Sequence, residues 1–381
     1  MAVVSLEKCT SYDYNDVREG IRRSIDHLGG LSGYLTPGER ILLKVNLLMK
    51  KRPEEATTTH PIFVKALADE LLDYGCEVLI GDSPGGPFNE GVLKGIYKVC
   101  GYEDIAENSA VTLNWNFGQK DVKNPKGNLL KQLTVVDFLS DVDKVISVSK
   151  LKTHGMMRFT GAVKNMFGII PGLLKAEYHF KMPDVKDFSQ MLVDVCLYAD
   201  PVLSFMDGIV GMEGAGPSGG DPRPIGAIVA SNSPYHLDVI ATQLIGVDPT
   251  SVPTIQRCID AQLIEEDYGD IALKGQSTEE WAIKDFKIPN IRSIEFFNQL
   301  PGPIKRMADK ALRPRPVFRH GKCIGCGDCA EACPPHVIEM KERLPYVDLE
   351  GCIRCFCCQE LCPAVAIDIK RPWLMKIIAR G

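Results

Sequence analysis

The feature that most constrains this chain is a duplicated run of cysteines near its end. Nine of the fourteen cysteines lie between residues 323 and 362. The first run reads CIGCGDCAEACP (323–334) and the second reads CIRCFCCQELCP (352–363), so that both follow the spacing C-x2-C-x2-C-x3-C-P. The copies are related by a shift of 29 residues, which predicts an internal repeat.

This spacing is typical of a protein that holds two iron–sulfur clusters. Three thiolates in a tight loop each hold one iron of a cubane, and in the bacterial two-cluster pattern the fourth cysteine of each run serves the other cluster. We therefore predict two [4Fe–4S] clusters. The first set of ligands is Cys323, Cys326, Cys329 and Cys362, and the second set is Cys352, Cys355, Cys358 and Cys333. A zinc site is the alternative, but zinc usually takes two CxxC pairs separated by a longer gap.

The other cysteines do not fit this pattern. Cys357 falls between two predicted ligands, next to Phe356. We interpret it as a packing residue near a cluster, with an alternative ligand as the second interpretation. The five cysteines before residue 300 are scattered, and we expect them to be small buried side chains.

Composition limits the class of protein. The 381 residues favour two to three domains. A net charge of −5 argues against general binding to nucleic acid. No apolar run reaches the length needed to cross a bilayer, and the start does not read as a signal peptide. We expect a cytoplasmic protein whose thiols stay reduced.

Strands and helices are expected to alternate along the first 290 residues. The predicted strands are 41–46, 77–82, 144–151, 201–208 and 225–232, and the predicted helices are 61–75, 90–101, 185–200 and 234–246. Such alternation indicates an α/β fold with a parallel sheet covered on both faces. We expect an α/β body over 1–290, a linker over 291–315, a small ferredoxin-like α+β two-cluster domain over 316–370 and a tail over 371–381.

Three loops are expected at the carboxyl ends of the strands, where sheets of this kind bind ligands. One is 82–86, beginning with Asp82. Another is 207–224, whose glycine-rich stretch 211–220 contains Gly211, Gly214 and Gly216. Its backbone amides can cradle an anion, and a flexible surface loop is the alternative. We predict Asp82 and these glycines as cofactor-binding residues.

The third loop opens the segment SKLKTHGMMRFTGAVKNMFGIIPG (149–172), which is rich in cations and glycine. Its lysines suit a carboxylate or phosphate, and a histidine there can act as acid, base or metal ligand. The alternative is a solvated basic face. We predict Lys152, His154 and Lys164 as catalytic residues, with His60 from an earlier loop.

The body resembles the family named domain of unknown function 362. The resemblance rests on TTTHP (57–61), GDSPGG (81–86), KLKTH (150–154), GAVKNMFGIIPG (161–172), DGIVGMEGAGPSGG (207–220) and DVIATQLIGVDP (238–249). His154, followed ten residues later by Lys164 and then by Pro-Gly, is also similar to nickel-dependent lactate racemase. That resemblance implies an acid/base histidine and a lysine that carries a nickel-pincer cofactor, so a further metal or organic cofactor in the body stays open.

These features favour an iron–sulfur oxidoreductase. We expect electrons to pass from the clusters to a small anionic substrate or cofactor in the body, with a redox partner protein as donor. The alternatives are a non-catalytic electron carrier or assembly partner with a docking domain and, third, a racemase-like enzyme with a metal cofactor.

Overall fold

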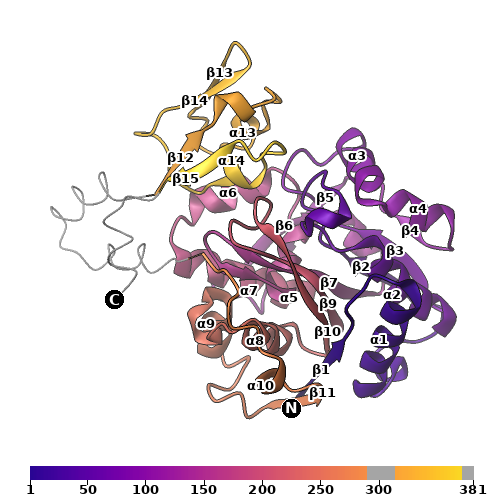
Figure 1. Ribbon diagram of the computed structural model, residues 1–381. Helices are drawn as coiled ribbons and strands as arrows, with labels where there is room; N and C mark the ends of the chain where they lie inside the picture. The colour runs from indigo at the N-terminus through magenta and orange to yellow at the C-terminus, as the bar shows by residue number, and fades with distance from the viewer. Residues whose placement is uncertain (290–313, 371–381) are drawn as a thin grey trace.

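The computed structural model describes residues 1–289 and 314–370. The predicted tail over 371–381 lies outside these residues, as does the predicted linker except for its last two positions. The described chain forms a large α/β body with a small module of cysteine-bearing loops beside it (Figure 1).

A mixed sheet forms the centre of the body. Its strand order is β11-β1-β10-β9-β7-β2-β3-β4, and the short β8 pairs with β7. The strands are β1 (Ala2–Lys8), β2 (Arg40–Lys44), β3 (Glu77–Gly81), β4 (Thr112–Leu113), β7 (Lys144–His154), β8 (Arg158–Thr160), β9 (Leu203–Glu213), β10 (Asp221–Ser231) and β11 (Ile271–Gly275). Within the described residues, β8 and β10 run against the others. The expected α/β class is confirmed, but the sheet is not wholly parallel, because β9 returns as β10 in a hairpin.

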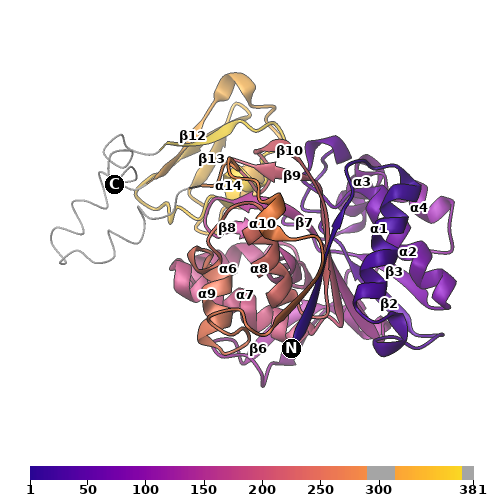
Figure 2. The same ribbon diagram turned by 60° about the horizontal axis from the view of Figure 1, so that its bottom comes forward.

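Helices cover both faces of this sheet (Figure 2). The first group is α1 (Tyr14–His27), α2 (Pro61–Tyr74), α3 (Glu90–Cys100) and α4 (Tyr102–Glu107). The second group is α5 (Ala162–Asn165), α6 (Leu174–Lys181), α7 (Val185–Ala199), α8 (Pro234–Leu244), α9 (Pro253–Asp260) and α10 (Thr278–Trp281). A separate hairpin is made of β5 (Gln119–Lys123) and β6 (Gln132–Val136).

Alternation along the strands explains the two layers of core. On β2, Ile41 and Leu43 pack toward the α1–α4 layer, whereas Leu42 packs toward the opposite layer. Successive side chains of a strand point to opposite faces, so a continuous apolar strand serves both cores. Lys44 ends this run and is also fully buried.

Several predicted elements match closely. Helix α2 starts at the expected Pro61 and ends before Gly75, whose φ of +97° is a left-handed conformation that glycine adopts readily. The prediction for β7 was too short. The strand runs on to His154, so Lys150, Lys152 and His154 lie on a strand and not in a loop after it. Most of the predicted loop over 207–224 is likewise strand, within β9 and β10.

The module has its own small core, formed largely by cysteines. Strand β12 (Arg315–Phe318) pairs with β15 (Ile367–Lys370), and β13 (Ile338–Lys341) pairs with β14 (Leu344–Val347). Two short helices, α13 (Asp328–Glu331) and α14 (Cys357–Glu360), occupy equivalent places in the two cysteine runs. The antiparallel strands and short helices are those of the expected ferredoxin-like region.

Candidate functional site

Two cavities in the module separate the predicted cluster ligands into their two sets. The first set lines an empty volume of about 360 Å³, and the second set lines one of about 330 Å³. No three His, Cys, Asp or Glu side chains of residues 1–289 and 314–370 gather closely enough to hold a single metal ion. Four thiols around a cavity fit a cubane, whose irons are spread over its corners. The residues therefore fit the expected clusters, and their ligation stays a prediction.

The backbone of the module repeats with the same period as its sequence. Gly325 and Gly327 have φ values of +68° and +90°, and the amide of Gly325 donates to Sγ of Cys323 at 3.4 Å. In the second run, Arg354 and Phe356 hold the equivalent left-handed positions at +61° and +62°. Such a conformation costs a non-glycine residue roughly 1–2 kcal/mol. The loop around the second set therefore keeps the shape of the first despite its different side chains.

A pocket lies where the body meets the module. Its empty volume is about 640 Å³, which includes the part open to solvent. The body supplies the carboxyl ends of β2 and β3, the segment around α5, and α6. The module supplies Cys357, Glu360 and Leu361, from α14 and the residue after it. Neither part alone completes this pocket.

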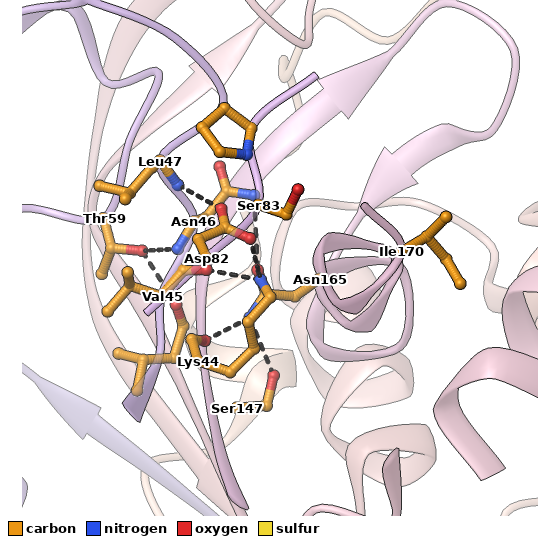
Figure 3. A network of polar contacts seen from close by, with 12 residues as sticks. Lys44, Val45, Asn46, Leu47, Thr59, Asp82, Ser83, Ser147, Asn165 and Ile170 are labelled. Carbon is orange, nitrogen blue, oxygen red and sulfur yellow. Dashed lines mark hydrogen bonds and ion pairs between the residues drawn. The ribbon is translucent and has the colours of Figure 1, made fainter. Parts of the chain in front are cut away.

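A buried polar network forms its floor (Figure 3). Nζ of Lys44 lies 2.9 Å from Oδ1 of Asp82 and donates to Oδ1 of Asn165 at 3.2 Å. The other carboxylate oxygen of Asp82 accepts from the amide of Leu47 at 2.8 Å. The amide of Asn165 donates to the Lys44 carbonyl and to Ser147 Oγ. The floor thus joins β2, β3, β7 and α5, and its charges are balanced.

Two further lysines make the pocket cationic. Lys164 makes no hydrogen bond or ion pair with the described residues, and its Nζ stands 5.8 Å from the Phe167 ring. Burial lowers the pKa of Lys164, against the opposing field of Glu360. Lys175 donates to the carbonyls of Ser83 and Ile170, and burial lowers its pKa to about 7. The pocket can therefore attract an anion and also contains an amine that titrates near neutrality.

The body and the module are joined by a contact between His154 and Glu360. Nε2 of His154 lies 3.1 Å from Oε1 of Glu360, off the line of a straight hydrogen bond. Nδ1 accepts from the amides of Met156 and Met157, which places the ring proton on Nε2. Burial alone would raise the pKa of Glu360, but His154, Lys164 and His179 outweigh it and hold the pKa at about 2. Glu360 is therefore an anion held among cationic and polar groups of the body.

Two more pocket residues carry reactive groups. His179 is buried, and its Nδ1 has no partner among the described residues. Burial lowers the pKa of His179 to about 4, so the ring is neutral at neutral pH. Cys357 is buried and faces the pocket, not either thiol-lined cavity. This fits the interpretation of Cys357 as a packing residue. It also places Cys357 where the module borders the pocket.

The structure separates the predicted catalytic residues. Lys164 lines the pocket, and Lys152 lies behind it, where Nζ donates to Oδ1 of Asn46 at 2.7 Å. Burial lowers the pKa of Lys152 well below its usual value. His154 lies at the contact with the module, as described above.

His60 belongs to a different cluster. Its ring stacks on Tyr12 at 3.6 Å and its amide donates to Asp207. Asp207 is paired with Lys150 at 2.7 Å, and both are buried. Burial lowers the pKa of His60 to about 4. His60 is not among the residues that line the pocket, and it caps α2 by accepting from the amide of Ile62.

Only one of the predicted cofactor-binding residues lies in the pocket. Asp82 lies in the pocket floor, whereas Gly211, Gly214 and Gly216 do not line the pocket. A Cβ at Gly211 would stand 2.5 Å from Ile225, and one at Gly216 would stand 2.2 Å from the Thr153 carbonyl. Close packing explains Gly211 and Gly216, whereas Gly214 has a φ of +78°, a left-handed conformation that glycine adopts readily. The hairpin tip instead meets the module, where Ser218 Oγ donates to the Glu360 carbonyl at 2.6 Å.

Sequence reasoning missed Lys44, Lys175, Asn165 and Glu360. Lys44 did carry a signal, because a lysine at the end of a continuous apolar strand must be paired when it is buried. Glu360 carried none by itself, since its neighbours in the chain are cluster ligands and its partner is 206 residues away.

Comparison with known proteins finds a family match in the body and another in the module. Residues 41–243 match the family described as domain of unknown function (DUF362), which is more than half of the chain. The chain belongs to this family. Residues 322–366 match the 4Fe-4S dicluster domain. A DUF362 body is thus joined to an iron–sulfur-binding domain, whose kind is associated with electron transfer.

One relative is the thylakoid-associated protein sll1697 of Synechocystis sp., which is 34% identical over 254 residues, or 66% of this chain and 77% of the relative. Two solved structures are similar at 13% identity. The lactate racemase apoprotein from Thermoanaerobacterium thermosaccharolyticum covers 62% of this chain with a TM-score of 0.39, and a Thermotoga maritima protein covers 60% with a TM-score of 0.37. The chain spans 55% and 57% of their lengths. Among the described helices, none is long and apolar enough to cross a membrane.

Proposed function

We propose that this DUF362 protein is an iron–sulfur oxidoreductase that reduces or oxidises a small anionic substrate in the pocket between body and module. One observation carries the proposal. Helix α14 contributes Cys357 and Glu360 to a lysine-lined pocket and contributes Cys358 to the cavity of the second set. A substrate in the pocket would thus lie beside a predicted cluster.

Different residues of the pocket would bind the anion, keep the pocket floor in place and transfer protons. Lys164, whose ammonium is unpaired by the described residues, offsets the charge of an anion. Lys44 is neutralised by Asp82 and keeps the floor in place. The module covers one side of the pocket, and reduced contact with water strengthens each of these interactions. Lys175 and His179 are the groups that can donate or accept a proton at the substrate.

The bound clusters would supply single electrons. A two-electron reduction then takes two electrons from an external one-electron donor protein and protons from the pocket side chains and solvent. The protein would leave the reaction in its starting redox state.

The test begins with protein purified without oxygen, reduced and freed of excess reductant. It is mixed with the small anions of a cell extract, separated by anion exchange, and cluster oxidation is followed by absorbance. Wild-type protein should be oxidised by a particular fraction and should convert one of its components. Lys164→Gln should lose at least tenfold in this rate while its clusters reduce normally, whereas Lys98→Gln, an exposed lysine on α3, should behave as wild type.

The contrary result is also informative. If no fraction oxidises the wild-type protein, while both variants still pass electrons normally to an acceptor protein, the chain is an electron carrier and the pocket is not catalytic.

A further inference from the structure

The two copies of the cysteine run provide an internal comparison of their surroundings. Positions 29 residues apart are equivalent, so Cys357 corresponds to Asp328 and Glu360 to Glu331. On α13, Asp328 and Glu331 are exposed. On α14, Cys357 is buried and the side chain of Glu360 is only 14% exposed. The same turn of helix is therefore free in one copy and covered by the body in the other.

The covering contacts all come from the body. The Ser218 hydroxyl donates to the Glu360 carbonyl, and His154 faces the Glu360 carboxylate. Leu361 packs on Gly85 of the body. Figures 1 and 2 show α14 against the body. The position equivalent to Leu361 is Ala332, so the second copy has the larger apolar side chain where it docks.

The second set adjoins the pocket along the chain. The Cys357 thiol lines the pocket, and Cys355, two residues before it, belongs to the second set. Cys358, the next residue of α14, lines the second cavity. On a helix, consecutive side chains point about 100° apart, so the pocket and the second cavity lie on adjoining sides of one turn.

The first set faces outward. Cys326 is exposed, and Ile324, between Cys323 and Cys326, is 59% exposed. The cavity of this set, like that of the second set, is lined by residues of the module alone, but none of the three cysteines of its first run lines the pocket. Its link toward the body is Cys362, which follows Leu361. Because of that link, the alternative is that the first set, and not the second, exchanges electrons with the pocket.

We propose that the second set holds the centre that exchanges electrons with the pocket, and that the first set holds the centre that receives them from outside. This order rests on the proposed function. One electron would pass from an external reduced protein, with an exposed iron–sulfur or flavin group, to the outer centre, then to the inner centre and then to the substrate. Electron transfer slows steeply with distance, so the centre beside the pocket determines the last step.

Cys357 is a positioning residue in this arrangement. Its thiol lines the pocket, and in the chain it stands between Cys355 and Cys358, which line the cavity of the second set. Hydrogen bonds to cluster sulfurs and nearby charges set cluster potentials. Cys357 and Lys164 should therefore influence the inner centre and leave the outer centre unchanged.

The test is a potentiometric titration of the full-length holoprotein, followed by electron paramagnetic resonance without added substrate. Cys355→Ser marks the signal of the second set and Cys326→Ser that of the first. Ile324→Lys marks the first set without loss of a ligand, because it adds a positive charge beside that set. Lys164→Gln and Cys357→Ala should lower the midpoint potential of the Cys355-marked centre only, whereas Cys357→Ser, which keeps a donor, should restore most of the wild-type value.

Two results would overturn the order. One is a shift in the centre marked by Cys326 and Ile324, and the other is no shift in either centre while Lys98→Gln also has no effect. Neither depends on finding a substrate. A protein with the predicted shifts and no converted substrate would refute the proposed reaction and leave the order of the two centres standing.

Discussion

Removing the carboxylate of Asp82 should destabilise the body strongly. Asp82→Ala leaves Lys44 buried without its partner at 2.9 Å and leaves the Leu47 amide without its acceptor. Breaking a buried ion pair from one side costs roughly 3–5 kcal/mol. Since 1 kcal/mol moves Tm by about 2–4 °C in a domain of 150–250 residues, we expect Tm to fall by roughly 6–20 °C.

The assay is thermal unfolding without oxygen, followed by far-ultraviolet circular dichroism. The control is Glu177→Ala, which removes one partner of the exposed Lys181–Glu177 pair, whose side chains are 65% and 55% exposed. Exposed pairs contribute about 0–1 kcal/mol, so Tm should fall by no more than about 4 °C. The double variant Lys44→Met, Asp82→Asn removes both charges and should recover part of the loss. Equal Tm values for Asp82→Ala and Glu177→Ala would refute the assignment of a buried ion pair to the pocket floor.

Three other predictions address the clusters, the pocket and the docking contact. Protein purified without oxygen should contain about eight irons per chain, and elemental analysis giving four or fewer in fully loaded wild type would contradict two cubanes. Because burial sets the pKa of Lys175 to about 7, its positive charge is present below that pH and lost above it. The affinity for sulfate, measured by calorimetry, should therefore fall as pH rises from 6 to 8, and the same pH dependence in Lys175→Met would exclude Lys175 as its source. Glu360→Gln should reduce the protection of the Met156 and Met157 amides from hydrogen exchange, because His154 loses the carboxylate that its Nε2 faces. Glu331→Gln, at the exposed equivalent position, should have no such effect.

The local elements of the body could be predicted because their signals are local. Pro61 and Gly75 bound α2, and unbroken apolar runs mark β2 and β3. The end of β7 could not be predicted in this way. Its last three residues, Lys152 to His154, look polar and loop-like, yet they are buried. Their polar groups are satisfied by distant residues, such as Asn46 for Lys152 and the hairpin tip for Thr153. Long-range partners of this kind leave no trace in the local pattern.

The candidate site shows the same limit. The lysines of the segment 149–172 share a neighbourhood in the chain, but Lys150 pairs with Asp207, Lys152 lies behind the pocket and only Lys164 lines it. Strand alternation alone would place Lys150 and Lys152, which are two residues apart, on the same face of β7. The register of β7 against β9 shifts between these two lysines, and Lys164 lies beyond the strand on α5. The glycines of 211–220 misled for a related reason. Tight hairpin packing selects glycine just as an anion-binding loop does.

The duplicated cysteine run contains more information about the site than its ligand spacing alone. Where the two copies agree, as in the cysteines and the left-handed positions of their loops, the shared requirement is the cavity that each set surrounds. Where the residue types of the two copies differ, the difference reflects whether the helix faces solvent or the body. Asp328 is exposed and suits a helix in water, whereas Cys357 and Leu361 suit a helix against a protein surface. Aligning the two copies would thus have predicted that the second copy docks on the body. It would also have predicted that the glutamate kept in both copies needs a buried partner in the second copy, as Glu360, and not in the first. That partner is His154, the residue for which the body sequence suggested a role without showing what it would meet.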